Sequence, residues 1–163
     1  MKDLAIVATG GTIDKVYFDA KSRYEVGPPN VEKVLGELNL SITFTVTSLM
    51  RKDSLDMTRE DRKLLHDHIA TEPCPRILVT HGTDTMVKTA RSLLSLKDKT
   101  IVFTGALEPA LFKTSDAVFN IGCAVGAVQA LPFGVYIVMN AKVFPADRVV
   151  KNLSLNRFEQ ISP

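Results

Sequence analysis

The sequence predicts an α/β fold, in which a mostly parallel, doubly wound sheet carries helices on both of its faces. Two observations support this prediction. Short apolar runs alternate with segments of helical periodicity, and two of the runs end in turns of glycine and threonine. Strands that alternate with helices at this spacing form parallel sheets covered by helices. A chain of 163 residues is expected to form one domain.

The expected strands are short. Residues 4–8 form a continuous apolar run, and residues 42–48 alternate apolar residues with threonine, which is strand periodicity. Three further strands are expected at residues 77–80, 101–104 and 135–139. Residues 142–163 are harder to place, and both an edge strand and packing against a partner subunit remain open.

Helical patterns fill the intervals between these strands. They cover residues 31–40, 58–70, 84–96 and 115–130. Thr58 is expected to cap the second helix, because Asp61 stands three residues later. Pro132 and Gly134 are expected to stop the last one.

The composition limits the possible functions. A net charge of +2 is too small to favour nucleic acid or an acidic membrane surface as a partner. No apolar run approaches the roughly 20 residues of a membrane span, and the start reads as a first strand rather than a signal peptide. Cys74 and Cys123 lack the paired spacing of metal or redox sites. We therefore expect a cytoplasmic protein.

Two threonine-glycine turns are the main candidates for chemistry. The first, Thr9-Gly10-Gly11-Thr12, follows the strand at residues 4–8, and the second, Thr80-His81-Gly82-Thr83-Asp84-Thr85, follows the strand at residues 77–80. Neighbouring parallel strands open onto one crevice at their carboxyl ends. Both turns should therefore lie at the mouth of one cleft, where two threonines and an aspartate favour acyl-transfer chemistry.

Each turn also fits a purely structural role. Glycines suit a strand exit, and Thr83 or Asp84 suits the cap of the helix that follows. The catalytic interpretation requires a neighbouring group to remove the proton of Thr12, since a threonine hydroxyl is otherwise a poor nucleophile. His81 is expected to fix the geometry of its turn rather than to act as a general base.

Two other segments are candidates for substrate contact. Residues 15–25 are polar, weakly periodic and followed by Gly27-Pro28-Pro29, which suits a lid. Asp53-Ser54-Leu55-Asp56 lies between a strand and a helix, so it is either a substrate-facing loop or an ordinary one. His66 and His68 are two residues apart on a helix and make a poor metal pair.

Together these segments resemble the L-asparaginase family over nearly the whole chain. The matching segments are Thr9-Gly10-Gly11-Thr12-Ile13, Tyr24-Glu25-Val26-Gly27, Asp53-Ser54-Leu55-Asp56-Met57, Thr80-His81-Gly82-Thr83-Asp84-Thr85-Met86, Thr104-Gly105-Ala106, and Ser115-Asp116 through Asn120. The resemblance implies that residues 1–163 form a single α/β domain of the asparaginase N-terminal type.

The resemblance also implies roles for individual residues. Thr12 would be the nucleophile, with Tyr24 on a flap helping to activate it. Thr83 and Asp84 would form a second catalytic pair, and Asp84 would also hold the substrate α-amino group. The implied substrate-binding residues are Gly11, Ser54 for the α-carboxylate, Leu55, Gly82, and Ala106, whose carbonyl would face the side-chain amide. No metal or organic cofactor is implied.

The expected function is hydrolysis of L-asparagine to L-aspartate and ammonia through a threonine-linked acyl-enzyme, in a homo-oligomer. A glutaminase or D-asparaginase is an alternative, as is a non-catalytic binder of acidic amino acids. A nucleotide-binding module fits less well, because the turns lack the dinucleotide fingerprint and a P-loop lysine.

The sequence departs from the family's pattern in three ways. The family is expected to place a lysine late in the helix at residues 115–130, but this chain reads Val128-Gln129-Ala130-Leu131, which leaves Lys113 and Lys142 as substitutes. Leu55 stands where glutamine is common. The chain also resembles the short members that lack the second domain, which in typical members completes the neighbouring subunit's site.

Overall fold

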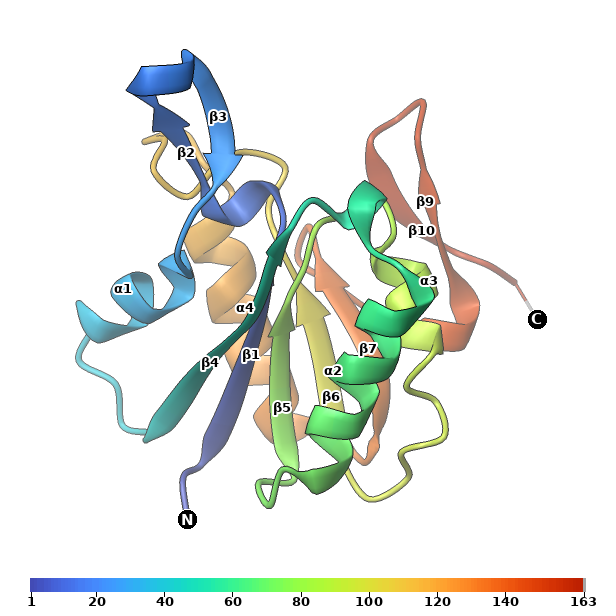
Figure 1. The fold of residues 1–163 in the computed structure, drawn as a ribbon. Coiled ribbons are helices and arrows are strands. Elements are labelled where there is room, and N and C mark those ends of the chain that lie inside the picture. Colours follow the sequence, from blue (N-terminus) through green and yellow to red (C-terminus); the bar gives the residue numbers. More distant parts are fainter. Residues whose placement is uncertain (163) are drawn as a thin grey trace.

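A six-stranded sheet forms the centre of the computed structural model, which describes residues 1–162 (Figure 1). Its order is β4-β1-β5-β6-β7-β8, and all strands run parallel except the edge strand β8. The strands are β1 (Leu4–Gly10), β4 (Phe44–Lys52), β5 (Arg76–Thr80), β6 (Thr100–Thr104), β7 (Gly134–Met139) and β8 (Lys142–Pro145). The predicted fold class is confirmed.

Helices cover both faces of this sheet, as Figure 1 shows. The helices α1 (Asn30–Gly36) and α4 (Ala117–Ala130) pack on one face, and α2 (Arg59–Thr71) and α3 (Met86–Arg91) on the other. Alternate residues of β1 divide between the two cores. Ala5 and Val7 join the cluster with α2 and α3, whereas Leu4 and Ile6 join the cluster with α1 and α4. Residues in a strand point alternately to opposite faces, so one apolar run supplies two cores.

Two hairpins rise beyond the carboxyl ends of the parallel strands, on opposite sides of the molecule (Figure 1). One pairs β2 (Lys15–Phe18) with β3 (Arg23–Val26), and the other pairs β9 (Val149–Asn152) with β10 (Arg157–Gln160). The segment expected to be a lid is therefore the β2–β3 hairpin. The predicted edge strand after residue 142 is β8, while the β9–β10 hairpin was not predicted.

Several element boundaries differ from the prediction, and three of them have a clear structural reason. The first helix ends at Gly36 rather than at residue 40, which fits the low helix propensity of glycine. The third ends at Arg91 rather than at residue 96: Ser92 Oγ donates to the Thr89 carbonyl, and the next amides bond three residues back. The second strand runs to Lys52 because it pairs with β1 as far as Gly10.

The helix α2 begins as the sequence predicts. Thr58 Oγ1 accepts a hydrogen bond from Asp61 N at 3.1 Å, and Asp61 Oδ2 accepts one from Thr58 N at 2.8 Å. This capping box satisfies two amide groups that the helix itself leaves unpaired. Lys52 Nζ, at the end of β4, lies 2.8 Å from the same Asp61 oxygen, so the strand and the helix are joined there.

Neither a membrane-crossing helix nor a group of three candidate metal ligands is found within residues 1–162. Both cysteines are free thiols. Cys74 is buried, and Cys123 packs at the edge of the core on the α4 side.

The strand order places a topological switch point between β1 and β5. The chain passes from β1 to β4 on one side and later returns to β5 on the other, and such a switch point opens a crevice at the carboxyl ends of the strands. Thr9 Oγ1 donates to the Thr80 carbonyl at 2.8 Å, which ties the two strand ends together.

The turns that follow these strands touch through their backbones. Gly11 has a φ of +93°, and a Cβ atom there would lie 2.4 Å from Gly82 N. A Cβ atom on Gly82 would lie 2.7 Å from the Ser54 Cβ atom. Because real Cβ contacts are never so short, each position must be glycine for three chain segments to meet.

The Gly11→Ala variant is expected to lower the free energy of unfolding by at least about 2 kcal/mol, because backbone atoms cannot move aside for the added methyl group. Urea denaturation measures this change. The matched control is Gly126→Ala in α4, where the added Cβ would have no atom within 4 Å outside the neighbouring backbone of its own helix. This control should raise the free energy of unfolding by about 0.5–1 kcal/mol. Equal stability of the wild type and Gly11→Ala would contradict the contact.

A buried carboxyl group lies beneath the β2–β3 hairpin. Asp14 is 1% exposed, and its Oδ1 accepts a hydrogen bond from Asn30 N at the start of α1 at 2.8 Å. Burial raises the pKa of this carboxyl from 3.8 to about 6, against the opposing effects of the Asn30 hydrogen bond and the Arg51 charge. The folded state therefore holds a proton between these pH values that the unfolded chain releases.

The carboxyl of Asp14 should make the protein less stable as the pH rises. Its contribution is fully present below pH 3.8, the unfolded value, and is lost as the pH passes about 6. Asp14→Asn keeps the acceptor oxygen and removes the titration. The free energy of unfolding of the variant minus that of the wild type should therefore be larger at pH 8 than at pH 4, by up to about 3 kcal/mol. Urea denaturation of both proteins across this range tests it. A difference between them that does not change with pH would contradict the prediction.

Candidate active site

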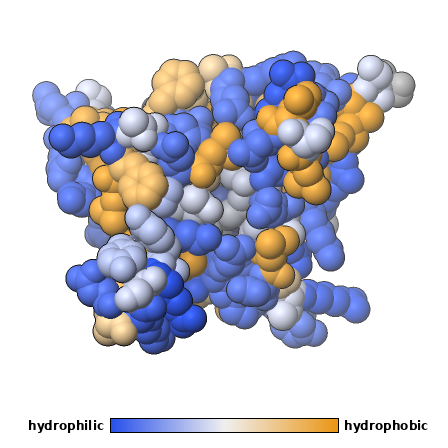
Figure 2. Space-filling model, turned by 90° about the horizontal axis from the view of Figure 1, so that it is seen from above, coloured by the Kyte–Doolittle hydropathy of each residue, from blue (hydrophilic) through white to orange (hydrophobic). Residues whose placement is uncertain are grey.

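The candidate site is assembled at the carboxyl ends of four neighbouring strands. Thr12 follows β1, Ser54 follows β4, Thr83 follows β5 and Ala106 follows β6. Figure 2 views this end from above and shows a pale, hollowed centre between more strongly coloured sides. Residues of intermediate hydropathy, such as glycine, serine and threonine, have this colour.

Thr12 begins a short 3-10 helix, η1 (Thr12–Asp14), directly after the contact between the two turns. The Gly11 carbonyl accepts a hydrogen bond from Asp14 N at 3.1 Å, and Gly11 N donates to the Lys52 carbonyl at 2.9 Å. The backbone on either side of Thr12 is thus fixed. Its side chain is half-buried, which leaves it within reach of a ligand in the cleft.

The second turn holds a compact polar cluster. Lys151 Nζ, from β9, lies 2.8 Å from Thr83 Oγ1 and 2.7 Å from Asp84 Oδ1. The Lys151 side chain is 7% exposed and that of Asp84 is 43% exposed. A nearly buried amine is therefore held between a hydroxyl and a carboxylate at the rim of the cleft.

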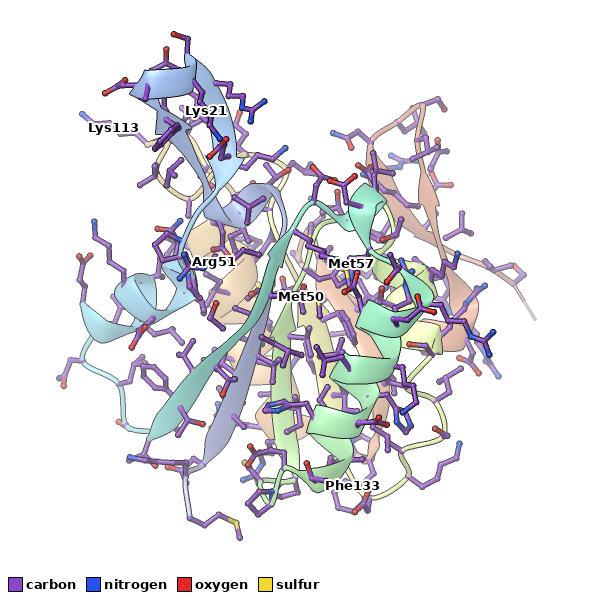
Figure 3. All side chains as sticks on the ribbon, viewed as in Figure 1. Lys21, Met50, Arg51, Met57, Lys113 and Phe133 are labelled. Carbon is purple, nitrogen blue, oxygen red and sulfur yellow. The ribbon has the colours of Figure 1, made fainter. Side chains whose placement is uncertain are left out.

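This cluster corrects the expected source of the lysine. It comes neither from α4 nor from the two substitutes suggested by the sequence. Lys113 stands in the loop beside the β2–β3 hairpin, on the opposite side of the molecule (Figures 1 and 3). Lys142 lies over the Phe144 ring, with its nitrogen 5.3 Å from the ring centre. Sequence reasoning missed Lys151 because its segment showed no strand or helix pattern.

The capping interpretation of the second turn is wrong. The helix α3 begins only at Met86, its N-cap residue is Thr85, and no side chain caps it. The polar side chains of Thr83 and Asp84 instead contact Lys151. They are therefore available for chemistry rather than occupied by the helix terminus.

His81 has a structural position, in line with the expectation. It is fully buried, and its Nδ1 lies 2.6 Å from the Gly82 carbonyl, to which only a protonated nitrogen can donate. Burial lowers the pKa of His81 to about 4, although the Gly82 contact opposes this and the Arg62 charge adds to it. A neutral imidazole below the turn holds the peptide of Gly82 in place.

Ser54 and Leu55 differ sharply in their surroundings. They begin the 3-10 helix η3 (Ser54–Asp56). Ser54 is 2% exposed, and its Oγ accepts a hydrogen bond from Thr85 N at 3.3 Å. Leu55 is 70% exposed, and its amide donates to Asp53 Oδ1. The structure brings Ser54 to the second turn, while the Leu55 side chain faces solvent.

Tyr24 belongs to a separate group of aromatic residues. It is 48% exposed on β3, with its ring edge-on to Tyr17 at 5.4 Å and to Phe112 at 5.9 Å between ring centres. It also lines a cleft of about 530 Å³ between the hairpin and the end of β4, where Lys15 pairs with Asp53 at 3.2 Å. No hydrogen bond within residues 1–162 joins Tyr24 to Thr12, so its role in activating Thr12 stays a prediction.

The loop after β6 is held by Asp116. The carboxylate of Asp116 accepts hydrogen bonds from Leu107 N and Glu108 N, and Asn120 Nδ2 donates to the Gly105 carbonyl at 3.0 Å. These contacts fix Ala106, which is 1% exposed, at the end of its strand. The segment from Ser115 to Asn120 therefore holds the loop that follows β6.

Comparison with known proteins is consistent with this arrangement. The chain is 33% identical over 163 residues to L-asparaginase 2 of Escherichia coli (strain K12), covering 93% of this chain and 47% of that protein. It is 28% identical to a glutaminase-asparaginase of Acinetobacter glutaminasificans, covering 98% of this chain and 53% of that protein.

A solved structure, the thermostable L-asparaginase from Thermococcus kodakarensis, superposes with a TM-score of 0.85 at 25% identity, covering 98% of this chain and 52% of the other. The chain thus spans about half the length of the relatives it matches. The family model described as "Asparaginase, N-terminal" matches residues 3–161. On this match, the chain belongs to the asparaginase family.

Proposed function

We propose that this protein hydrolyses L-asparagine to L-aspartate and ammonia through an ester formed on Thr12. The contact of Lys151 with both Thr83 and Asp84 is the observation that carries the proposal. Capping explains neither contact, and a nearly buried amine beside a hydroxyl is an arrangement suited to proton transfer.

In the first step, Thr12 Oγ attacks the side-chain amide carbon of asparagine. The hydroxyl proton leaves with the amide nitrogen as ammonia, and an aspartyl ester of Thr12 forms. Backbone N–H groups in the turn of Gly10 and Gly11 are suited to stabilise the developing oxyanion. The Ala106 carbonyl, which follows the carboxyl end of β6, is proposed to orient the amide nitrogen.

In the second step, water hydrolyses the ester. In its neutral form, Lys151 Nζ accepts a proton from Thr83 Oγ1, which in turn takes a proton from the attacking water. The resulting ammonium is stabilised by Asp84, whose carboxylate lies 2.7 Å away. As the ester bond breaks, the ammonium returns this proton through Thr83 to Thr12 Oγ, so Thr12 leaves as the restored hydroxyl and aspartate is released. The same carboxylate is partly exposed, so it is also suited to bind the substrate α-ammonium group.

The main alternative is an amidase with a different preference, namely a glutaminase or a D-asparaginase. The exposed Leu55 supports it, because position 55 offers no amide group to a substrate, and so does the likeness to a glutaminase-asparaginase. The lack of a lysine late in α4 is the reason to consider a non-catalytic binder. The contacts of Lys151 with Thr83 and Asp84 weigh against this alternative, because they supply an amine beside the second turn.

We also propose that the protein acts in the cytoplasm as a homo-oligomer. The support for an oligomer is the open mouth of the cleft, which has exposed apolar residues on the hairpins at both sides. These are Tyr17, Phe18, Val150, Leu153 and Leu155.

Thr12→Ala should lower ammonia release from L-asparagine by at least about a thousandfold, because the attacking oxygen is gone. Thr12→Ser retains a hydroxyl and should keep measurable turnover. Ammonia release from L-asparagine, L-glutamine and D-asparagine, with circular dichroism as a control of folding, measures both. A Thr12→Ala protein as active as the wild type would exclude the assigned nucleophile.

Lys151→Met should lower kcat by roughly 10²–10⁴-fold, because Thr83 loses its only basic neighbour among residues 1–162. Lys142→Met is the matched control on the edge strand β8, and its kcat should stay within about twofold of the wild type. Steady-state kinetics on L-asparagine compares the two. The reverse pattern, with Lys142 essential and Lys151 dispensable, would refute the proposed second step.

A further inference from the structure

Arg62 on α2 is a buried cation outside the groups assigned to the reaction. The residue is 7% exposed, and no carboxylate within residues 1–162 forms an ion pair with it. Burial lowers the pKa of its guanidinium, while the nearby Asp61 opposes this. Arginine is seldom buried without a carboxylate, so its remaining contacts must compensate for the loss of water.

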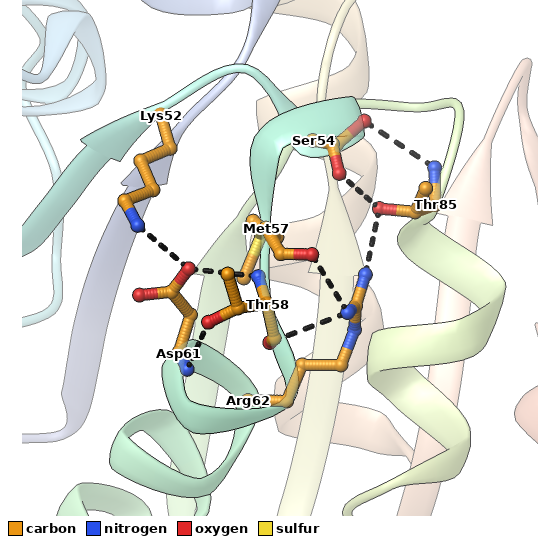
Figure 4. A network of polar contacts seen from close by, with 7 residues as sticks. All are labelled: Lys52, Ser54, Met57, Thr58, Asp61, Arg62 and Thr85. Carbon is orange, nitrogen blue, oxygen red and sulfur yellow. Dashed lines mark hydrogen bonds and ion pairs between the residues drawn. The ribbon is translucent and has the colours of Figure 1, made fainter.

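Each of the three guanidinium nitrogens donates a hydrogen bond instead. Nε donates to Thr89 Oγ1 at 2.9 Å, and one terminal nitrogen donates to Thr85 Oγ1 at 3.1 Å. The other donates to the carbonyls of Met57 and Thr58, at 3.1 and 3.3 Å (Figure 4). Arg62 thus joins the start of α2 to α3.

The direction of these bonds fixes the hydroxyl of Thr85. A guanidinium can only donate, so Thr85 Oγ1 accepts from Arg62 and must place its one hydrogen elsewhere. It donates this hydrogen to the Ser54 carbonyl at 2.7 Å, while Thr85 N donates to Ser54 Oγ at 3.3 Å. Figure 4 shows this chain of contacts from Arg62 through Thr85 to Ser54.

The hydroxyl of Ser54 has an unused hydrogen-bond donor. Its Oγ accepts from Thr85 N, and the hydrogen bonds within residues 1–162 include none that Ser54 Oγ donates. Its hydroxyl hydrogen therefore has no acceptor among these residues, and a ligand that enters the site can supply one. A carboxylate is such a ligand, and a bond to a charged acceptor is strong only if its donor is held in place.

We propose that Arg62 is a positioning residue for substrate recognition: acting through Thr85, it holds Ser54 against the second turn so that Ser54 can donate to the substrate α-carboxylate. This inference rests on the proposed function and extends it. This contact with the α-carboxylate would distinguish amino acid amides, which carry that group, from simple amides. The effect should appear in binding rather than in the chemical step.

Two threonines provide a matched test, because Arg62 donates to both but only Thr85 contacts Ser54. Thr85→Val and Arg62→Met should each raise KM for L-asparagine roughly tenfold, with kcat within about threefold of the wild type. The dissociation constant of L-aspartate, measured by calorimetry, should rise in parallel. Thr89→Val should leave both quantities within about twofold, and Arg62→Lys should partly restore them.

Thermal unfolding of each variant separates folding from binding, and Thr85→Val carries the test if Arg62→Met does not fold. The positioning role is overturned if Thr85→Val binds L-aspartate like the wild type, or if Thr89→Val is impaired to the same extent. If the wild type binds L-aspartate but releases no ammonia, the proposed hydrolysis fails while the binding data still decide the role of Arg62. If the wild type neither binds nor hydrolyses, both proposals fall.

Discussion

The contact between the backbones of Gly11 and Gly82 is the constraint on which the candidate site depends. There is no room for a side chain between the two turns, and Gly82 is pressed in turn against Ser54. Three loops from three strands therefore share one fixed arrangement. Packed backbones of this kind transmit any displacement directly, because no flexible side chain can absorb it. This contact sets the relative positions of the hydroxyls of Thr12, Ser54 and Thr83.

Two nearly buried basic side chains, Arg62 and Lys151, reinforce that arrangement. Arg62 joins α2 and α3 to the loop of Ser54, and Lys151 joins the β9–β10 hairpin to the turn of Thr83. Arg62 is held by hydroxyl and carbonyl oxygens alone within residues 1–162, whereas Lys151 is held by the Thr83 hydroxyl and the Asp84 carboxylate. Such networks specify one geometry because any unsatisfied donor in a buried site is costly.

The sequence allowed features that depend on neighbouring residues to be predicted. Contacts between residues remote in the sequence were not predicted. The capping box of Thr58 and Asp61 acts over three residues, and the turns after β1 and β5 follow from parallel strands opening at one edge. The early end of α3 depends on the Ser92 hydroxyl competing for a backbone carbonyl, which periodicity does not reveal. Lys151 was missed because its partners lie 68 and 67 positions away and only the folded sheet brings them together.

That separation along the chain makes the candidate site a late product of folding. The link between Thr9 and Thr80 closes 71 positions, and the one between Lys151 and Thr83 closes 68. Contacts between remote positions form slowly, because the chain loses the entropy of closing a long loop before it gains the favourable energy of the contact. No single hairpin or helix pair contains enough of the site to work alone. The candidate site is therefore complete only in the finished sheet, and the appearance of the proposed activity would mark the end of refolding rather than any intermediate stage.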